Sequence, residues 1–170
     1  MVKKRERACL KVTIIGNTSW GNTLGALLSD KGAAVTLWTR SEAEAKELNR
    51  GRRGYSSTSH IREALSGADL AIWAVPSQRL RQNVSQAKNY LTNSMLLISA
   101  AKGLEVDSGK RMSQVLAEEI APSLKGQICV LSGPNLAGEI AQGLPAASVI
   151  AAQDIALAER AKELMESPKF

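Results

Sequence analysis

Short runs of aliphatic residues alternate along this chain with longer segments in which apolar residues recur at helical spacing. The runs predict six β-strands, at residues 11–15, 34–38, 70–75, 95–100, 128–132 and 146–151. Five of these six runs are apolar throughout or nearly so. Strands that read this way are buried on both faces, as in parallel sheets covered by helices.

The segments between the runs predict helices at residues 20–29, 42–49, 61–65, 78–90, 110–119, 136–142 and 154–166. In the first of them, Leu24, Leu27 and Leu28 fall on one face, which we expect to pack against the sheet. Residues 51–59 are rich in glycine and serine and predict a loop. The alternation predicts an α/β fold of the Rossmann type, a doubly wound and mainly parallel sheet with helices on both faces.

The chain divides into a basic N-terminal tail, residues 1–9, and one domain, residues 10–170. A chain of 170 residues buries enough apolar surface for a single core. The last predicted helix is followed only by "SPKF", where a doubly wound sheet would continue with another strand. We therefore expect the sequence to be one domain of a longer protein.

The composition, 44% hydrophobic and 22% charged residues, is typical of a globular protein. No apolar run approaches the length that spans a bilayer, and no cleavage-like site follows the basic N-terminus. We expect a cytoplasmic protein without a membrane partner. Cys9 and Cys129 are 120 residues apart, a spacing that fits no metal motif. We expect two buried free thiols and no metal site.

Two basic clusters, "KKRER" and "RGRR", contribute to the net charge of +6. Such clusters sometimes bind nucleic acid, but the chain has only six aromatic residues (three Trp, two Tyr, one Phe) and no stripe in which basic and aromatic residues interleave. A nucleic-acid partner is therefore the weakest hypothesis. An anionic small ligand or a solvated tail explains the charge equally well.

The stretch "GNTSWG", Gly16 to Gly21, joins the first predicted strand to the first predicted helix. It nearly matches the dinucleotide-binding pattern GxGxxG, whose outer glycines allow the tight turn and the close packing of helix on strand. Thr18 replaces the middle glycine and narrows the approach of a pyrophosphate, although its hydroxyl offers a hydrogen bond to a phosphate oxygen. We expect weakened binding; the alternative is a plain strand-to-helix turn that binds no nucleotide.

Arg40 ends the second predicted strand, where enzymes that bind NAD usually carry an acidic residue for the ribose hydroxyls. A guanidinium instead pairs with a 2′-phosphate, which favours NADP over NAD. The alternative is a surface arginine paired with Glu42 or Glu44.

Three further stretches carry a resemblance. "AVPS" (residues 74–77), "SAAKGLE" (residues 99–105) and "LSGPNLAGEIAQGLPAASVIA" (residues 131–151), together with "SWG" and "LWTR", resemble in order and spacing the N-terminal domain of bacterial NAD(P)-dependent glycerol-3-phosphate dehydrogenase. The similarity spans residues 10 to 170. The family reduces dihydroxyacetone phosphate reversibly to sn-glycerol 3-phosphate in glycerophospholipid synthesis. A small phosphate substrate and, for the full-length form, a possible homodimer are implied.

The resemblance also assigns roles to matching residues. It implies cofactor contacts for Gly16, Thr18, Ser19, Trp20, Gly21, Arg40, Pro76, Lys102 and Ala137, and substrate contacts for Lys102, Gly133 and Asn135. Lys102 would be the catalytic cation, since hydride addition to a ketone builds negative charge on oxygen. "SGPN" would present backbone N–H groups with its asparagine at a helix N-terminus. The alternatives are a solvated loop lysine and an ordinary capped turn.

The chain also departs from the family. Thr18 replaces a glycine, residues 49–61 lack a longer proline-containing segment, and the C-terminal helical domain with the principal catalytic lysine is missing. We expect the chain alone to bind cofactor but to turn over little substrate. Two other functions stay open: a two-domain dehydrogenase acting on hydroxy acids, and a non-catalytic nucleotide-sensing domain.

Overall fold

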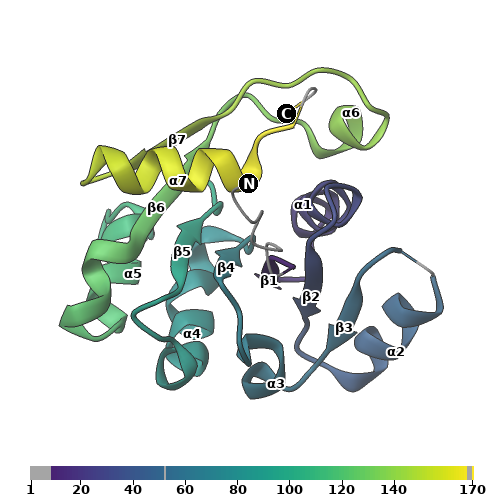
Figure 1. The fold of residues 1–170 in the computed structure, drawn as a ribbon. Helices are drawn as coiled ribbons and strands as arrows, with labels where there is room; N and C mark the ends of the chain where they lie inside the picture. The colour runs from purple at the N-terminus through teal and green to yellow at the C-terminus, as the bar shows by residue number, and fades with distance from the viewer. Residues whose placement is uncertain (1–8, 52, 168–169) are drawn as a thin grey trace, which may run out of the picture.

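The computed structural model describes residues 9–51, 53–167 and 170. Its seven strands form one sheet in the order β3-β2-β1-β4-β5-β6-β7 (Figure 1). The strands are β1 (Lys11–Ile15), β2 (Ala34–Trp38), β3 (Ser56–Thr58), β4 (Leu70–Trp73), β5 (Leu96–Ser99), β6 (Ile128–Ser132) and β7 (Val149–Ala152). All neighbours pair in parallel except β6 and β7, which are antiparallel. The predicted doubly wound, mainly parallel sheet is confirmed.

Helices cover both faces of the sheet. They are α1 (Ser19–Asp30), α2 (Glu42–Arg50), α3 (Ile61–Leu65), α4 (Ser77–Ala87), α5 (Met112–Glu119), α6 (Ala137–Ala141) and α7 (Ile155–Met165), with short 3₁₀ turns η1 (Lys88–Tyr90) and η2 (Pro122–Gln127). One apolar layer joins α1 and α7 to the sheet, and another joins α3, α4 and α5 to its opposite face. Every residue of β4 and β5 is buried, as their apolar sequences predict.

Three predictions need correction. Residues 51–59 are not entirely loop, because they contain β3, a polar edge strand of three residues that pairs with β2. The last predicted strand begins later than expected, at Val149. Of the two cysteines, Cys129 is buried as expected, but Cys9 is exposed. The remainder of the predicted basic tail, residues 1–8, lies outside the described residues.

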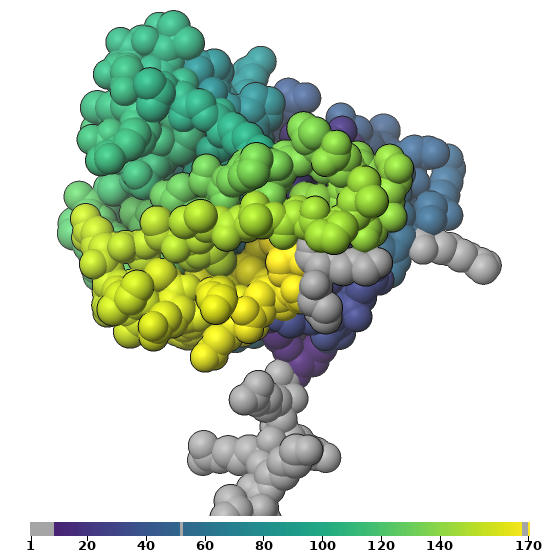
Figure 2. Space-filling model, turned by 90° about the horizontal axis from the view of Figure 1, so that it is seen from above, coloured from purple at the N-terminus to yellow at the C-terminus, as the bar shows by residue number. Residues whose placement is uncertain are grey.

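Within the described part of the chain, no helix combines the length and the apolar character needed to cross a membrane. Nor do its His, Cys, Asp and Glu side chains gather in groups of three that would hold a metal ion. Figure 2, seen from above, shows that α7 and the segment leading from β6 to β7 form one broad face of the molecule.

The fold places the start of α1 where the sheet changes direction. The chain runs outward from β1 to β2 and β3 on one side, and returns through α3 to β4 on the other. Ile15, at the end of β1, is therefore flanked by Trp38 of β2 and Trp73 of β4. In doubly wound sheets, ligands bind at this switch point, beyond the carboxyl ends of the strands.

Candidate functional site at the sheet switch point

The glycine-rich loop is fixed by close backbone contacts. Gly16 has φ +124°, and a Cβ there would lie 2.7 Å from the carbonyl oxygen of Ala74. Its N–H donates to the carbonyl of Trp38 at 3.1 Å, so the residue is held between β2 and the end of β4. Gly21 likewise has no room for a Cβ, which would collide with the Gly16 carbonyl. Both outer glycines are therefore required by the geometry of the turn.

Thr18 has a structural task in this loop. It is the N-cap of α1, where its Oγ1 accepts the N–H of Gly21 at 2.9 Å. The same hydroxyl donates to the carbonyl of Ala74 at 2.7 Å. Its proton is thus engaged inside the protein, and the expected donation to a phosphate oxygen would require breaking this bond. Thr18 joins the start of α1 to the end of β4.

The start of α1 remains suited to an anion. The first N–H groups of a helix have no partner inside the helix. Thr18 uses that of Gly21, while no partner within the described residues accepts the N–H of Ser19 or Trp20. The first turn also contains no acidic residue. Two N–H groups and the positive end of the helix dipole are available to a phosphate.

Lys102 lies in the loop after β5, at the same edge of the sheet. Its Nζ donates to the backbone carbonyls of Asn135 at 3.0 Å and Gly133 at 3.3 Å. The ammonium also lies 5.9 Å from the ring centroid of Trp20, within reach of a cation–π interaction. The structure therefore brings together three stretches of sequence that are far apart: the glycine-rich loop, the β5 loop and the "SGPN" turn.

The "SGPN" turn differs from its prediction in one respect. The N-cap of α6 is Leu136, and Asn135 does not cap the helix. Asn135 is buried instead, and its Nδ2 donates to Ser148 Oγ at 2.9 Å. Gly133 has φ +145°, and a Cβ there would lie 2.7 Å from the carbonyl oxygen of Ala147. The turn is thus packed against the segment just before β7, and its carbonyls face Lys102.

Two adjoining clefts lie over this edge. The first, of about 360 Å³, contains most of the predicted contact residues: Thr18, Ser19, Trp20, Pro76, Lys102, Asn135 and Ala137. The second, of about 380 Å³, begins at Gly16 and Thr18 and extends past Pro76 to Arg40. Gly21 and Gly133 do not line either cleft. Gly21 packs against the Gly16 carbonyl, and the Gly133 carbonyl accepts a hydrogen bond from Lys102, which lines the first cleft. The clefts share the glycine-rich loop, as a dinucleotide lying across it would require.

Arg40 is exposed at the end of β2, and within the described residues it makes no ion pair. The proposed alternative partners are engaged elsewhere, since Glu42 pairs with Lys46 at 2.7 Å and Glu44 accepts a hydrogen bond from Thr39. The same contact with Lys46 lowers the pKa of Glu42. A second arginine, Arg79, lines the same cleft as Arg40.

Sequence reasoning missed Arg79. It lies three residues after Pro76 in the first turn of α4, and the helix that follows β4 begins at the switch point of the sheet. Its position after "AVPS" was the available signal. A cleft with two arginines suits a ligand that carries a phosphate at this end.

Comparison with known proteins identifies the family. Residues 11–158 match the model for the NAD-dependent glycerol-3-phosphate dehydrogenase N-terminus. A glycerol-3-phosphate dehydrogenase [NAD(P)+] of Dehalococcoides mccartyi is 48% identical over 173 residues, covering 94% of this chain and 48% of that protein. One of Corynebacterium glutamicum is 42% identical over 175 residues, with 95% and 52% covered. The chain thus spans about half the length of these relatives.

Solved structures agree. The glycerol-3-phosphate dehydrogenase of Coxiella burnetii superposes with a TM-score of 0.83 at 25% identity, over 95% of this chain and 52% of that one. A pyrroline-5-carboxylate reductase of the same organism shares the fold alone, with a TM-score of 0.72 at 17% identity over 93% of this chain and 56% of that one. Because the family model matches most of the chain, the chain belongs to the NAD-dependent glycerol-3-phosphate dehydrogenase N-terminal family.

Proposed function

We propose that this chain is the cofactor-binding domain of an enzyme that interconverts dihydroxyacetone phosphate and sn-glycerol 3-phosphate with NAD(P)H. The observation that carries the proposal is the position of Lys102, whose ammonium lies between Trp20 of the glycine-rich loop and the carbonyls of Gly133 and Asn135. A cation in this place would be adjacent to a dinucleotide bound on the loop, and it contacts the turn that the family resemblance assigns to substrate.

The residues present fit a dinucleotide. Gly16 makes the tight turn that leads from β1 into α1, and the first two N–H groups of α1, those of Ser19 and Trp20, are free to hold a phosphate. In addition, Trp20 Nε1 and Asn135 Oδ1 are buried without a hydrogen-bond partner in the described structure. Such orphaned polar atoms are costly unless a ligand or water satisfies them, and both residues line the same cleft.

The bound nicotinamide would supply the hydride. Lys102 would stabilise the charge that grows on the carbonyl oxygen of the substrate as the hydride is added. Its two backbone carbonyl partners hold the ammonium in place before the substrate arrives, which lowers the cost of positioning it.

We further propose that the chain prefers NADP over NAD. Arg40 and Arg79 line one cleft at the end of β2, and within the described residues neither forms an ion pair. Guanidinium groups recognise phosphate through paired N–H donors. Glu44 also lines this cleft, but its carboxylate accepts a hydrogen bond from Thr39 and so has a partner already.

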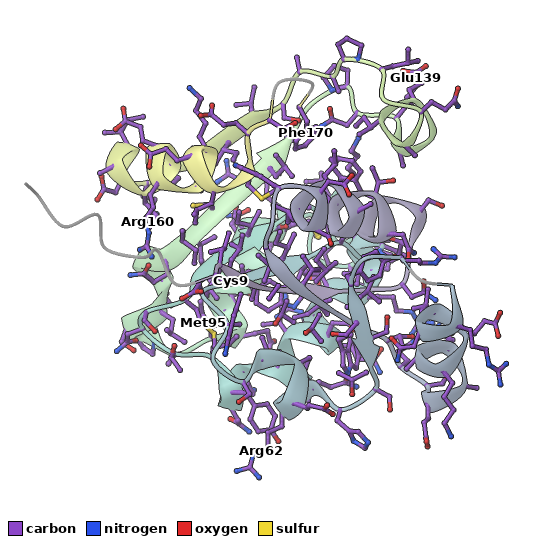
Figure 3. The ribbon with its side chains drawn as sticks, turned by 45° about the vertical axis from the view of Figure 1, so that its right-hand side comes forward. Cys9, Arg62, Met95, Glu139, Arg160 and Phe170 are labelled. Carbon is purple, nitrogen blue, oxygen red and sulfur yellow. The ribbon has the colours of Figure 1, made fainter. Side chains whose placement is uncertain are left out.

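Titration with NADPH and NADH, followed by quenching of tryptophan fluorescence, tests both proposals. We expect saturable binding of both and a lower Kd for NADPH. Arg40→Gln and Arg79→Gln should each weaken NADPH binding about tenfold while leaving NADH nearly unchanged, because a charge-assisted hydrogen bond to phosphate is lost. Arg62→Gln is the matched control, since this exposed arginine of α3, labelled in Figure 3, lines neither cleft.

Binding of neither cofactor at millimolar concentration would refute the proposed function and favour a domain of another kind. Equal losses for NADPH and NADH in the arginine variants would refute the preference alone. For the substrate, dihydroxyacetone phosphate added to the NADPH complex should shift amide NMR signals of residues 102, 133 and 135, and pyruvate should not. The reverse result would favour a dehydrogenase of hydroxy acids.

A further inference from the structure

The loop that carries Lys102 depends on contacts from outside for its shape. It runs from the end of β5 to the start of α5. The described backbone contacts inside it join residues 104–105 to residues 109–111: the bridge between Leu104 and Arg111, and the Gly109 N–H that donates to the Glu105 carbonyl at 2.8 Å. Leu104 and Val106 are 53% and 78% exposed. A loop with so little apolar burial is held by its polar contacts or not at all.

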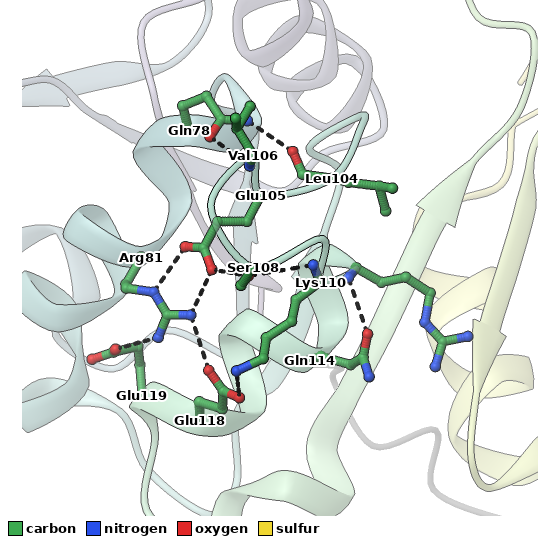
Figure 4. A network of polar contacts seen from close by, with 11 residues as sticks. Gln78, Arg81, Leu104, Glu105, Val106, Ser108, Lys110, Gln114, Glu118 and Glu119 are labelled. Carbon is green, nitrogen blue, oxygen red and sulfur yellow. Dashed lines mark hydrogen bonds and ion pairs between the residues drawn. The ribbon is translucent and has the colours of Figure 1, made fainter.

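Arg81 of α4 supplies the strongest of these contacts (Figure 4). Its Nε and Nη2 donate to the two carboxylate oxygens of Glu105, each at 2.8 Å, in a bidentate pair. The same guanidinium donates to Glu118 at 2.9 Å and to Glu119 at 2.8 Å, both at the end of α5. One side chain therefore joins α4, the Lys102 loop and α5.

Gln78, one turn before Arg81 on α4, forms hydrogen bonds with the peptide groups on either side of Glu105. Its Nε2 donates to the carbonyl of Leu104 at 2.7 Å, and its Oε1 accepts the N–H of Val106 at 3.1 Å. Glu105 is thus held by its side chain through Arg81 and by its neighbouring peptide groups through Gln78. The segment only two residues beyond Lys102 is therefore fixed to α4, whose N-cap Pro76 lines both cofactor clefts.

Arg81 also neutralises a concentration of negative charge. Without it, Glu105, Glu118 and Glu119 would face one another, and the described residues would leave them only two paired counter-charges: Lys110 on Glu118, and Lys88 at 3.7 Å from Glu119. Like charges at this range repel, and Glu105 is the one of the three that sits on a loop. Loss of Arg81 would therefore push the loop away from α5.

We propose that Arg81 is a positioning residue, which sets the place of the Lys102 ammonium through Glu105 and so determines how tightly the cofactor is held. This inference rests on the proposed function for its cofactor readout. Arg81 lines neither cofactor cleft, and its effect is indirect.

A double-mutant cycle on NADPH affinity tests this role, with Arg81→Met, Lys102→Met and the double variant. Arg81→Met should weaken binding about 5- to 50-fold, as expected for coupled contacts, and should have less than a twofold effect when Lys102 is already methionine. Glu118→Gln is the matched control, because it leaves the bidentate pair with Glu105 intact. Arg81→Lys should restore part of the affinity.

An equal loss of affinity in both backgrounds would overturn the proposal, since Arg81 would then act on the fold and not through Lys102. No loss from Arg81→Met in the wild-type background would overturn it as well. Near-ultraviolet circular dichroism checks that each variant is folded.

Hydrogen exchange of the ligand-free protein gives a readout that needs no cofactor. Arg81→Met should speed exchange of the amides at residues 101–106 at least tenfold, while those of β4 and β5 stay protected; unchanged exchange in the loop would refute the positioning role. If wild-type protein binds no cofactor, the proposed function fails, and this measurement alone still decides whether Arg81 holds the Lys102 loop.

Discussion

Replacing Thr18 by valine removes two hydrogen bonds while keeping the size of the side chain. The hydroxyl caps α1 through the N–H of Gly21 and donates to the buried carbonyl of Ala74. An N-cap contributes about 1 kcal/mol. A buried carbonyl that loses its partner costs about 1 kcal/mol more. We expect Thr18→Val to lower the free energy of unfolding by about 2 kcal/mol, and the melting temperature by about 4–8 °C.

Urea unfolding measures this loss as a shift of the midpoint at constant slope. Thr18→Ser is the control, because serine keeps the oxygen that makes both bonds, and it should remain within about 0.5 kcal/mol of wild type. Thr18→Gly loses both bonds but opens the backbone to the pyrophosphate, so it should be less stable than wild type and bind NADPH more tightly. The reasoning is refuted if Thr18→Val is as stable as wild type, or if serine destabilises as much as valine.

Further tests concern sterics, pH and thiol reactivity. Gly21→Ala should unfold or displace the loop and abolish NADPH binding, because its Cβ would collide with a backbone carbonyl; normal affinity by titration would contradict this. Arg81 lowers the pKa of Glu105 to about 2 from the ordinary 4.5. Because a depressed carboxyl pKa stabilises the fold above the unfolded value, that contribution should be complete above about pH 4.5 and lost towards pH 2. Urea midpoints across this range should fall less steeply in Arg81→Met. Burial raises the pKa of Cys129 to about 11, so at pH 8 iodoacetamide should label Cys9 alone, and both thiols in urea; mass spectrometry counts the adducts.

The architecture could be predicted from sequence because its signals are local. Strands such as β4 and β5 are buried on both faces and read as unbroken apolar runs. The glycine-rich loop was identifiable for the same reason, since strand, turn and helix are contiguous. By contrast, β3 was missed because "SST" is short and polar and becomes a strand only by pairing with β2.

The site residues could be predicted only where a contiguous motif identifies them, and not where their contacts come from distant parts of the sequence. The contact of Lys102 with the carbonyls of Gly133 and Asn135 spans more than 30 residues of sequence and follows from β5 lying next to β6. The role of Thr18 as a cap bonded to Ala74 likewise requires β4 to lie beside β1. The role of Arg81 could not be read from sequence because its glutamate partners come from the loop after β5 and from α5. Arg79 was missed because the cleft that it lines also contains residues of β2 and the glycine-rich loop.

The edge-to-face contact between Trp20 and Phe170 has a practical consequence for labelling the protein. The two ring centroids are 6.0 Å apart, so the chain returns after α7 to the glycine-rich loop (Figure 3). An affinity tag or fluorophore attached after Phe170 would start beside the cofactor cleft and would perturb the tryptophan signal used to follow binding. Conversely, an acceptor dye placed deliberately after Phe170 would convert Trp20 into an energy-transfer donor that reports movement of the loop.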